Sequence, residues 1–154
     1  MSGILHKKIK DMDSSKHEHK TFAYTRHEFV PRGYASQCLV SVYEIPPGKS
    51  AYPYHYHVKN EEVFYIISGN GMLKTPNDEK KVTSGEMLFF PADRSGAHKL
   101  TNTSETENLV YIDFSTHNDL DVCLYPDSNK VAIWGKGVNR LYRQDDNVDY
   151  YESE

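Results

Sequence analysis

From Gly33 onward the chain is a series of short apolar runs, each closed by turn-forming residues. The run YASQCLVSVYEI at 34–45 ends at Pro-Pro-Gly, and the run EEVFYIIS at 61–68 ends at Gly-Asn-Gly. Similar runs follow at 71–76, 81–92, 96–102, 107–115 and 130–135. Strands of this length, separated by glycine, proline and asparagine, are typical of β-sandwiches and barrels. No window has the apolar period of an amphipathic helix, so the pattern predicts an all-β fold.

Size and composition agree with one β-rich domain. The 154 residues suffice to bury a single core, and 12 Tyr, 6 Phe and 1 Trp favour strands. The net charge is −4 and no basic run is interleaved with aromatic residues, so we expect no nucleic-acid partner. The sequence has no apolar run of about 18 residues and no signal-peptide core, which predicts a cytoplasmic protein without a membrane partner.

The polarity and apolar periodicity of the chain suggest three segments. Residues 1–32 are polar, show neither a strand period nor a helix period, and are predicted to form an N-terminal arm. Residues 33–115 hold the strand series and are predicted to form a barrel. Residues 116–154 are predicted to be a C-terminal extension that packs on the barrel. Cys38 and Cys123 lie among aliphatic residues, which favours buried reduced thiols over a disulfide or a metal pair.

Histidines at positions 55 and 57 suggest a metal site. Side chains alternate across a strand, so His55 and His57 face the same way. By the same alternation one of Glu61 and Glu62 points inward, because Glu62 shares a face with Phe64 and Ile66 and Glu61 shares the other with Val63 and Tyr65. His98 follows a downstream apolar strand. If these strands are neighbours, three imidazoles and one carboxylate converge, a set that suits Fe, Mn, Ni, Cu or Zn better than Ca or Mg.

Two groups of residues resemble the motifs of the cupin superfamily. Its first motif is a glycine, a His-x-His pair, a glutamate and a second glycine, and its second motif contains glycine, proline, histidine and asparagine. The matching residues here are Gly48, His55, His57, Glu62 and Gly69, then Gly85, Pro91, His98 and Asn102. The resemblance covers residues 33–115. The C-terminal part is similar to the closing segments of small stand-alone bacterial cupins, some of which are labelled sugar-phosphate-isomerase-like.

This resemblance implies a double-stranded β-helix, or jelly-roll barrel, that holds a divalent transition metal. The implied ligands are His55, His57, Glu62 and His98. Many cupins pair through outer strands, so a homodimer is expected. The second motif departs from the family pattern, because Asp93 replaces the usual glycine and four residues rather than two separate it from His98. In the first motif, six residues rather than five lie between Gly48 and His55. Gly96 is expected to supply flexibility in the longer loop.

Several alternatives remain open. Glu61 could replace Glu62 as a ligand, since strand register read from sequence is uncertain by a residue or two, but the interval to Gly69 in the motif favours Glu62. In a second alternative the four site residues bind no metal and only form hydrogen bonds with one another. Four polar groups left without partners would be costly in a dry barrel, which disfavours this alternative. His17 and His19 have the same spacing as the site pair, yet their charged neighbours predict a solvated tail.

Other residues near the predicted site receive simpler roles. Asn102 is expected to brace a turn or a strand. The aromatic residues are expected to pack, with some lining the pocket mouth: Tyr52, Tyr54, Tyr56, Phe89 and Phe90. Asp93 and Arg94 are candidates for a pocket rim, and His27 and His117 are assigned to the surface.

Function is predicted only as a class. A site with three histidines and one carboxylate leaves coordination positions open, which suits a metal-dependent enzyme of the dioxygenase, isomerase or lyase type acting on a small polar molecule. The alternative is a cupin that binds a sugar or organic acid without catalysis, and a purely structural barrel is least favoured. The core strands offer only Lys74, Arg94 and Lys99 to hold a phosphate, so phosphate specificity has little support from the sequence.

Overall fold

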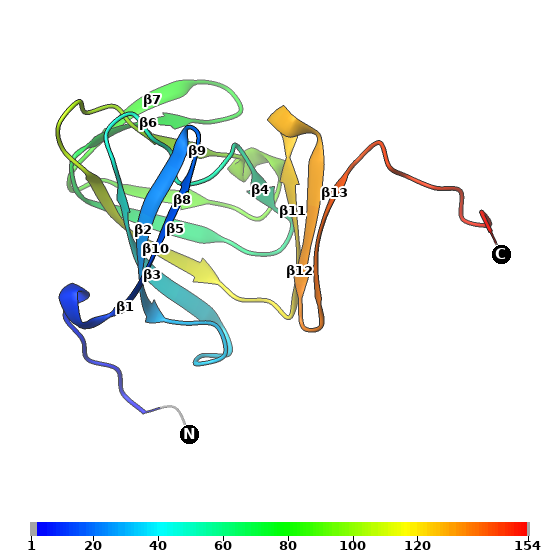
Figure 1. The fold of residues 1–154 in the computed structure, drawn as a ribbon, viewed down its shortest axis with the longest axis horizontal. Coiled ribbons are helices and arrows are strands. Elements are labelled where there is room, and N and C mark those ends of the chain that lie inside the picture. The colour runs from blue at the N-terminus through cyan, green and yellow to red at the C-terminus, as the bar shows by residue number, and fades with distance from the viewer. Residues whose placement is uncertain (1–2, 154) are drawn as a thin grey trace.

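The computed structural model describes residues 3–153 and is built almost entirely of strands (Figure 1). Three short 3-10 turns, Ile9–Asp11, Arg94–Gly96 and Pro126–Ser128, interrupt them. The strands are β1 (Asp13–His19), β2 (Phe22–Val30), β3 (Cys38–Ile45), β4 (Tyr56–His57), β5 (Glu62–Ser68), β6 (Asn70–Lys74), β7 (Glu79–Thr83), β8 (Met87–Phe90), β9 (Lys99–Asn102), β10 (Leu109–Thr116), β11 (Leu120–Tyr125), β12 (Lys130–Gly135) and β13 (Val138–Arg143). None of the helical turns among residues 3–153 is long and apolar enough to cross a membrane.

Two walls of antiparallel strands enclose the interior. One wall is a six-stranded sheet in the order β1-β2-β3-β10-β5-β8. The other combines the sheets β7-β6-β9 and β13-β12-β11-β4, which are linked where Ser50 bridges Thr101 and His55 bridges His98. This arrangement confirms the predicted all-β class and the double-stranded β-helix.

The apolar core fills one end of the space between the walls. Residues alternate along β5, where Phe64 and Ile66 are buried while Tyr65 between them is 41% exposed. The ring of Tyr43 on β3 stacks on that of Tyr111 on β10 at 5.2 Å. Burying each large side chain stabilises the fold by about 1.5–3 kcal/mol. The full cluster comprises Tyr43, Ile45, Ala51, Phe64, Ile66, Leu73, Val82, Phe90, Leu100, Leu109 and Tyr111.

The segment predicted as an N-terminal arm contains two strands, in which the sequence showed no strand period. These strands form the hairpin β1–β2, and β2 pairs with β3 so that the hairpin extends the six-stranded sheet. All seven residues of β1 are exposed, so backbone hydrogen bonds hold this edge strand and no apolar period marks it in the sequence. His17 and His19 are exposed as predicted, but they lie on this strand rather than in a tail. The segment boundaries themselves stay a prediction.

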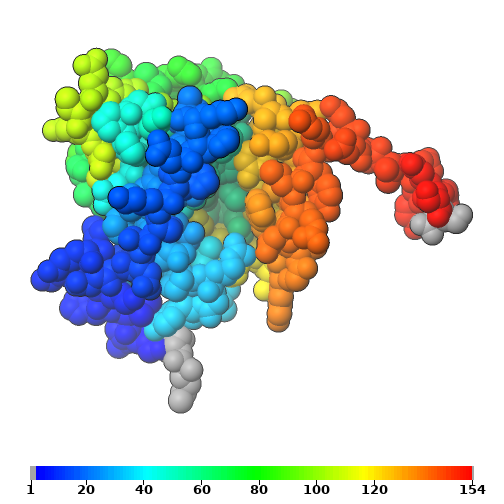
Figure 2. Space-filling view, viewed as in Figure 1, coloured from blue at the N-terminus to red at the C-terminus, as the bar shows by residue number. Residues whose placement is uncertain are grey.

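The C-terminal strands β11, β12 and β13 extend the second wall beside β4. Figure 2 shows this part of the chain, in orange, to the right of the blue N-terminal hairpin on the face in view. Residues 144–153 continue away from the barrel (Figure 1). Both cysteines are free, and Cys123 on β11 is buried while Cys38 on β3 is only half-buried.

Candidate metal centre

Backbone pairing sets four site residues in one row. His55 and His98 exchange two hydrogen bonds, from His55 N to His98 O at 3.1 Å and from His98 N to His55 O at 2.9 Å. Two residues further, His57 on β4 lies opposite Cys123 on β11. Residues directly opposite in an antiparallel pair share a face, as do residues two apart on one strand. The side chains of His98, His55, His57 and Cys123 therefore all face the interior.

Glu62 enters the site from the opposite wall. It begins β5 and is 8% exposed, whereas the neighbouring Glu61 is exposed on the outer surface. The structure thus agrees with the predicted register and gives Glu61 no access to the site. Glu62 Oε2 lies 3.4 Å from His98 Nε2 and 3.7 Å from His57 Nε2. The ligand atoms of His55, Glu62 and His98 all lie within 4.8 Å of one another.

Hydrogen bonds fix the tautomers of the histidines. His55 Nδ1 lies 2.8 Å from Pro53 O, and His98 Nδ1 lies 2.9 Å from Gly96 O. A carbonyl oxygen only accepts, so each Nδ1 carries the proton and each Nε2 keeps a lone pair. His57 Nδ1 lies 2.5 Å from the Asp121 carboxylate, which favours the same tautomer. All three imidazoles are therefore oriented by a second residue and can offer Nε2 to a cation.

Two buried polar atoms have no hydrogen-bond partner among residues 3–153, namely Glu62 Oε2 and His98 Nε2. Leaving such an atom unpaired costs about 1–3 kcal/mol, and most buried polar atoms in folded proteins are paired. The ring of Phe90 stacks on that of His98 at 3.7 Å and restricts its rotation. A divalent transition metal bound to both atoms would satisfy them, so the donor set fits such an ion.

Burial keeps two of the imidazoles neutral. It lowers the pKa of His55 to about 3, with a further contribution from the neighbouring His98. Burial also lowers the pKa of His98. For His57 burial acts in the same direction, but the hydrogen bond to Asp121 and the charge of Glu62 outweigh it and raise its pKa. His55 and His98 are thus ready to bind a metal at neutral pH, whereas a proton competes more strongly at His57.

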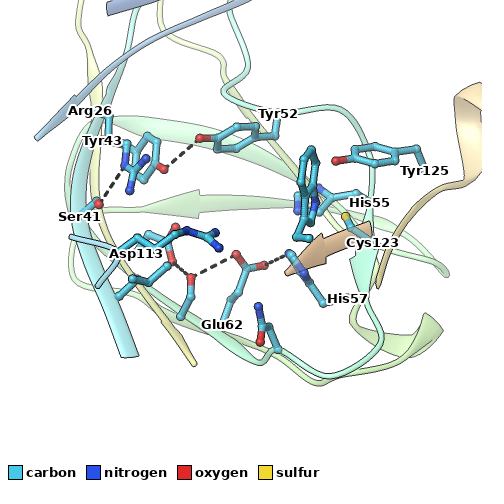
Figure 3. Close-up of a pocket in the computed structure, with 15 residues that line it drawn as sticks. Arg26, Ser41, Tyr43, Tyr52, His55, His57, Glu62, Asp113, Cys123 and Tyr125 are labelled. Carbon is cyan, nitrogen blue, oxygen red and sulfur yellow. Dashed lines mark hydrogen bonds and ion pairs between the residues drawn. The ribbon is translucent and has the colours of Figure 1, made fainter. Parts of the chain in front are cut away.

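A cavity of about 340 Å³ opens beside these residues (Figure 3). Polar groups line the wall away from His55, where Arg26 Nε lies 3.1 Å from Ser41 Oγ. Ser115 Oγ lies 2.8 Å from Asp113 Oδ1 and 3.5 Å from Glu62 Oε1. Burial, and then the charge of Glu62, raise the pKa of Asp113 to about 8. The remaining lining residues are Arg32, Leu39, Tyr43, Tyr52, His57, Asn60, Cys123, Tyr125 and Trp134.

Sequence reasoning missed several of these residues. Arg26 and Arg32 lie in the predicted N-terminal arm, to which sequence reasoning assigns no site residue. Asp121 and Cys123 lie two apart on β11, and the alternation in LDVCLY could have placed them on one face. Their meeting with His57 depends on long-range pairing, for which the local sequence carries no signal.

The other predicted roles have mixed outcomes. The buried Asn102 side chain donates to Ile45 O and to Glu107 O, both at 2.8 Å, so it braces the chain as expected. Phe90 is buried, but Phe89 is 59% exposed and does not pack inside. Asp93 accepts a hydrogen bond from Ser95 N and caps the turn at Arg94–Gly96. Neither Asp93 nor Arg94 is among the described residues that line the cavity.

Comparisons with known proteins agree with this geometry. The family model described as "Cupin domain" matches residues 41–115. A protein from Acidithiobacillus ferrooxidans, assigned provisionally as a sugar phosphate isomerase, has 27% identity and a TM-score of 0.80, with 94% of this chain and 93% of that one covered. A sugar phosphate isomerase of the cupin superfamily from Silicibacter pomeroyi has 16% identity and a TM-score of 0.80, covering 94% and 96%.

A more distant structure shows the same fold. A predicted oxalate decarboxylase from Thermotoga maritima has 15% identity and a TM-score of 0.62, with 75% of this chain and 100% of that one covered. No curated protein matches the chain. With both histidine motifs facing one interior, the double-stranded β-helix in place and the domain model matched, residues 41–115 of the chain form a cupin domain.

Proposed function

We propose that His55, His57, Glu62 and His98 bind one divalent transition metal, and that the protein is a metal-dependent enzyme acting on a small polar molecule. The observation that carries this proposal is the pair of unpartnered buried atoms, Glu62 Oε2 and His98 Nε2, 3.4 Å apart. They lie in a site where each of the three imidazoles is already oriented through its Nδ1 atom.

The cavity supports an enzymatic role over a structural one. A metal bound here would supply a Lewis acid to a substrate that enters from the cavity. Asp113 and Ser115 lie beside Glu62 on the same side of that space. A carboxyl group with a raised pKa holds a proton near neutral pH and can exchange it with a substrate, which an isomerase or a lyase requires. Asp113 is therefore the proposed proton-transfer residue.

Anionic substrates have more support from the structure than from the sequence. Arg26 and Arg32 line the cavity, and arginine binds phosphate and carboxylate groups through paired donors. Two similar structures carry names that refer to sugar phosphate isomerases. An isomerase of sugar phosphates is accordingly our first candidate among the reaction types, ahead of a dioxygenase.

Metal analysis of protein made without an affinity tag tests the site. We expect close to one equivalent of a transition metal in the wild type and little in His57→Ala. The matched control is His19→Ala, since His19 lies on the exposed strand β1 and should leave the metal content unchanged. Full metal occupancy in His57→Ala would overturn the proposed site.

Solvent isotope exchange tests the reaction type. An isomerase that moves a proton between neighbouring carbons should incorporate deuterium from D2O into a sugar phosphate, and Asp113→Asn should lose this exchange while keeping its metal. Uptake of O2 without such exchange would instead favour the dioxygenase type. A ligand that raises the melting temperature and is recovered unchanged would favour the alternative, a binding cupin without catalysis.

A further inference from the structure

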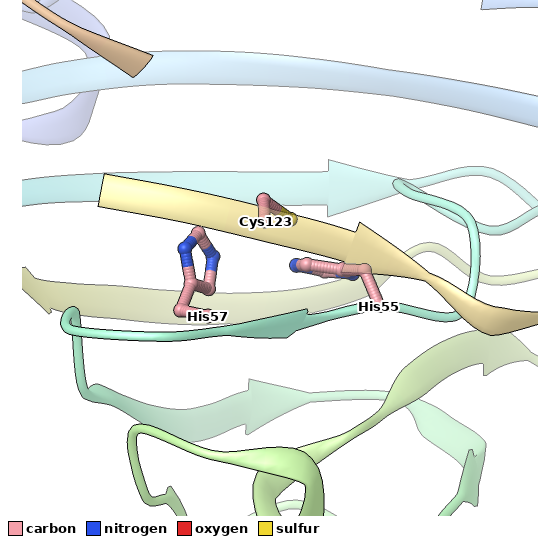
Figure 4. A group of neighbouring side chains, drawn as sticks. All are labelled: His55, His57 and Cys123. Carbon is pink, nitrogen blue, oxygen red and sulfur yellow. The ribbon is translucent and has the colours of Figure 1, made fainter. Parts of the chain in front are cut away.

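A second group of potential ligands lies beside the first. The ligand atoms of His55, His57 and Cys123 are all within 4.8 Å of one another. Figure 4 shows the Cys123 side chain beside the two imidazoles, with His57 and His55 projecting from neighbouring positions on one segment. This triad shares only His55 with the group formed by His55, Glu62 and His98. The centre therefore has a side rich in imidazole and sulfur and a side with a carboxylate.

The position of the thiol is set by the backbone. Cys123 on β11 lies between His57 on β4 and Ala132 on β12. The hydrogen bond from Val58 N to Val122 O at 2.9 Å holds the register beside this pair. Cys123 is 1% exposed and Ala132 is fully buried, so the thiol has little room to turn away. Its side chain lines the cavity rather than the outer surface.

We propose that Cys123 is an additional ligand, used by thiophilic ions such as Zn(II) and not by Mn(II). This inference rests on the proposed metal site. Zn(II) bound to Cys123 would also bind His55 and His57, while Mn(II), which prefers oxygen, would use Glu62 and the three histidines without the sulfur. On ligation the thiol gives its proton to solvent and a sulfur–metal bond forms. The sulfur thus makes the choice of metal depend on a residue outside the four-residue set.

The geometry permits this ligation with small movements. Zn–S and Zn–N bonds of about 2.3 and 2.0 Å place the nitrogen and sulfur ligands of one tetrahedral ion roughly 3.3–3.6 Å apart. Ligand atoms that lie within 4.8 Å of one another can reach such an ion when each moves by less than about 1 Å. The neighbouring Tyr125 ring, stacked on His55 at 5.8 Å, limits how far that imidazole can move.

X-ray absorption spectroscopy of the full chain loaded with Zn(II) or with Mn(II) tests the proposal. The Zn(II) form should show one sulfur atom at about 2.3 Å from the metal, and the Mn(II) form only nitrogen and oxygen. Cys123→Ser should lose the sulfur signal and bind Zn(II) about 10- to 100-fold more weakly, with unchanged affinity for Mn(II). Cys38→Ser is the matched control and should behave as the wild type.

The outcomes separate the two proposals. A Zn(II) form of the wild type that shows only nitrogen and oxygen ligands would overturn the role of Cys123 and leave the metal site standing. Failure of the wild type to bind either ion would overturn both. The spectrum of the wild type decides the matter by itself, so the test does not depend on whether Cys123→Ser folds.

Discussion

His57 Nδ1 lies 2.5 Å from Oδ2 of Asp121, a carboxylate 64 positions further along the chain. Asp121 is 2% exposed, and its Oδ1 accepts hydrogen bonds from Lys59 N at 2.8 Å and Asn60 N at 3.3 Å. Burial alone would raise the pKa of Asp121, but the hydrogen bond from His57 and the two backbone donors outweigh it and lower the pKa. One carboxylate thus orients a ligand candidate and closes the loop after β4.

Asp121→Asn should therefore weaken metal binding without removing a ligand. The amide can turn either its oxygen or its NH2 group to His57, so the imidazole loses its fixed tautomer and orientation. We expect metal affinity to fall about 10- to 100-fold. Competition with a chelator measures this change. Asp119→Asn, at an exposed position two residues earlier, is the control, and an equal effect in both variants would contradict the role of Asp121.

The local sequence predicted the site residues better than the residues that hold them in place. His55 and His57 could be predicted because strand alternation is a local rule, and Glu62 and His98 because their spacing resembles family motifs. Asp121 supports His57 from another strand, and this pairing is a long-range register that no local pattern encodes. Sequence reasoning missed Arg26 because β1 has no buried face, so the hairpin shows no alternation of apolar and polar residues that would mark it as strands.

The longer loop before His98 shows a different kind of miss. Gly96 was expected to provide flexibility, but the structure gives a steric reason for glycine. A Cβ atom at this position would lie 2.1 Å from Pro91 O, which is backbone. Close approach of two chain segments depends on the tertiary fold, so the sequence could suggest the glycine but not its cause.

The two neighbouring glutamates should behave differently. Glu62→Gln removes the charge of the inward carboxylate and should lower metal affinity at least about tenfold. Glu61 is exposed and directly precedes β5, so Glu61→Gln should leave metal affinity unchanged. Metal titration of both variants measures the contrast. The same metal content in the two variants would refute the role given to Glu62.

The metal-free protein should become less stable as pH falls below the ordinary histidine pKa. The pKa of His55 is about 3 in the folded protein against 6.5 for an ordinary histidine. Between these values the unfolded chain takes up a proton that the folded state does not, so the free energy of unfolding decreases by a few kcal/mol as pH falls through this window. The lowered pKa of His98 acts in the same direction.

His57 acts in the opposite direction. Its raised pKa stabilises the fold fully below the ordinary histidine pKa, and this contribution disappears as pH rises through the folded value. Thermal denaturation of chelator-treated protein at a series of pH values measures the sum. His55→Ala should have a shallower pH dependence than the wild type, and parallel curves for the two proteins would show that His55 does not cause the loss.

The outer face of the six-stranded sheet predicts a homodimer. Phe89 and Met87 on the edge strand β8 are 59% and 70% exposed, and Tyr65 and Phe114 are each 41% exposed. Phe89 lies opposite Val63 and Met87 opposite Tyr65, so these side chains form one apolar surface. We propose that a second copy of the chain covers it.

Phe89→Glu should sediment as a monomer where the wild type is a dimer, whereas Leu141→Glu on β13 should remain dimeric. A wild type that is monomeric at tens of micromolar would contradict the proposal.

The contact between Gly96 and Pro91 links backbone packing to the metal site. Gly96→Ala adds a methyl group 2.1 Å from Pro91 O, which the backbone can relieve only by moving the 3-10 turn Arg94–Gly96. Because Gly96 O accepts the hydrogen bond from His98 Nδ1, the same movement displaces the imidazole. We expect a lower melting temperature together with weaker metal binding, and excess metal should restore only part of the stability. Gly3→Ala is the control, since a Cβ there meets no atom within 4 Å. If Gly96→Ala kept the metal affinity of the wild type, this turn would not be what positions His98.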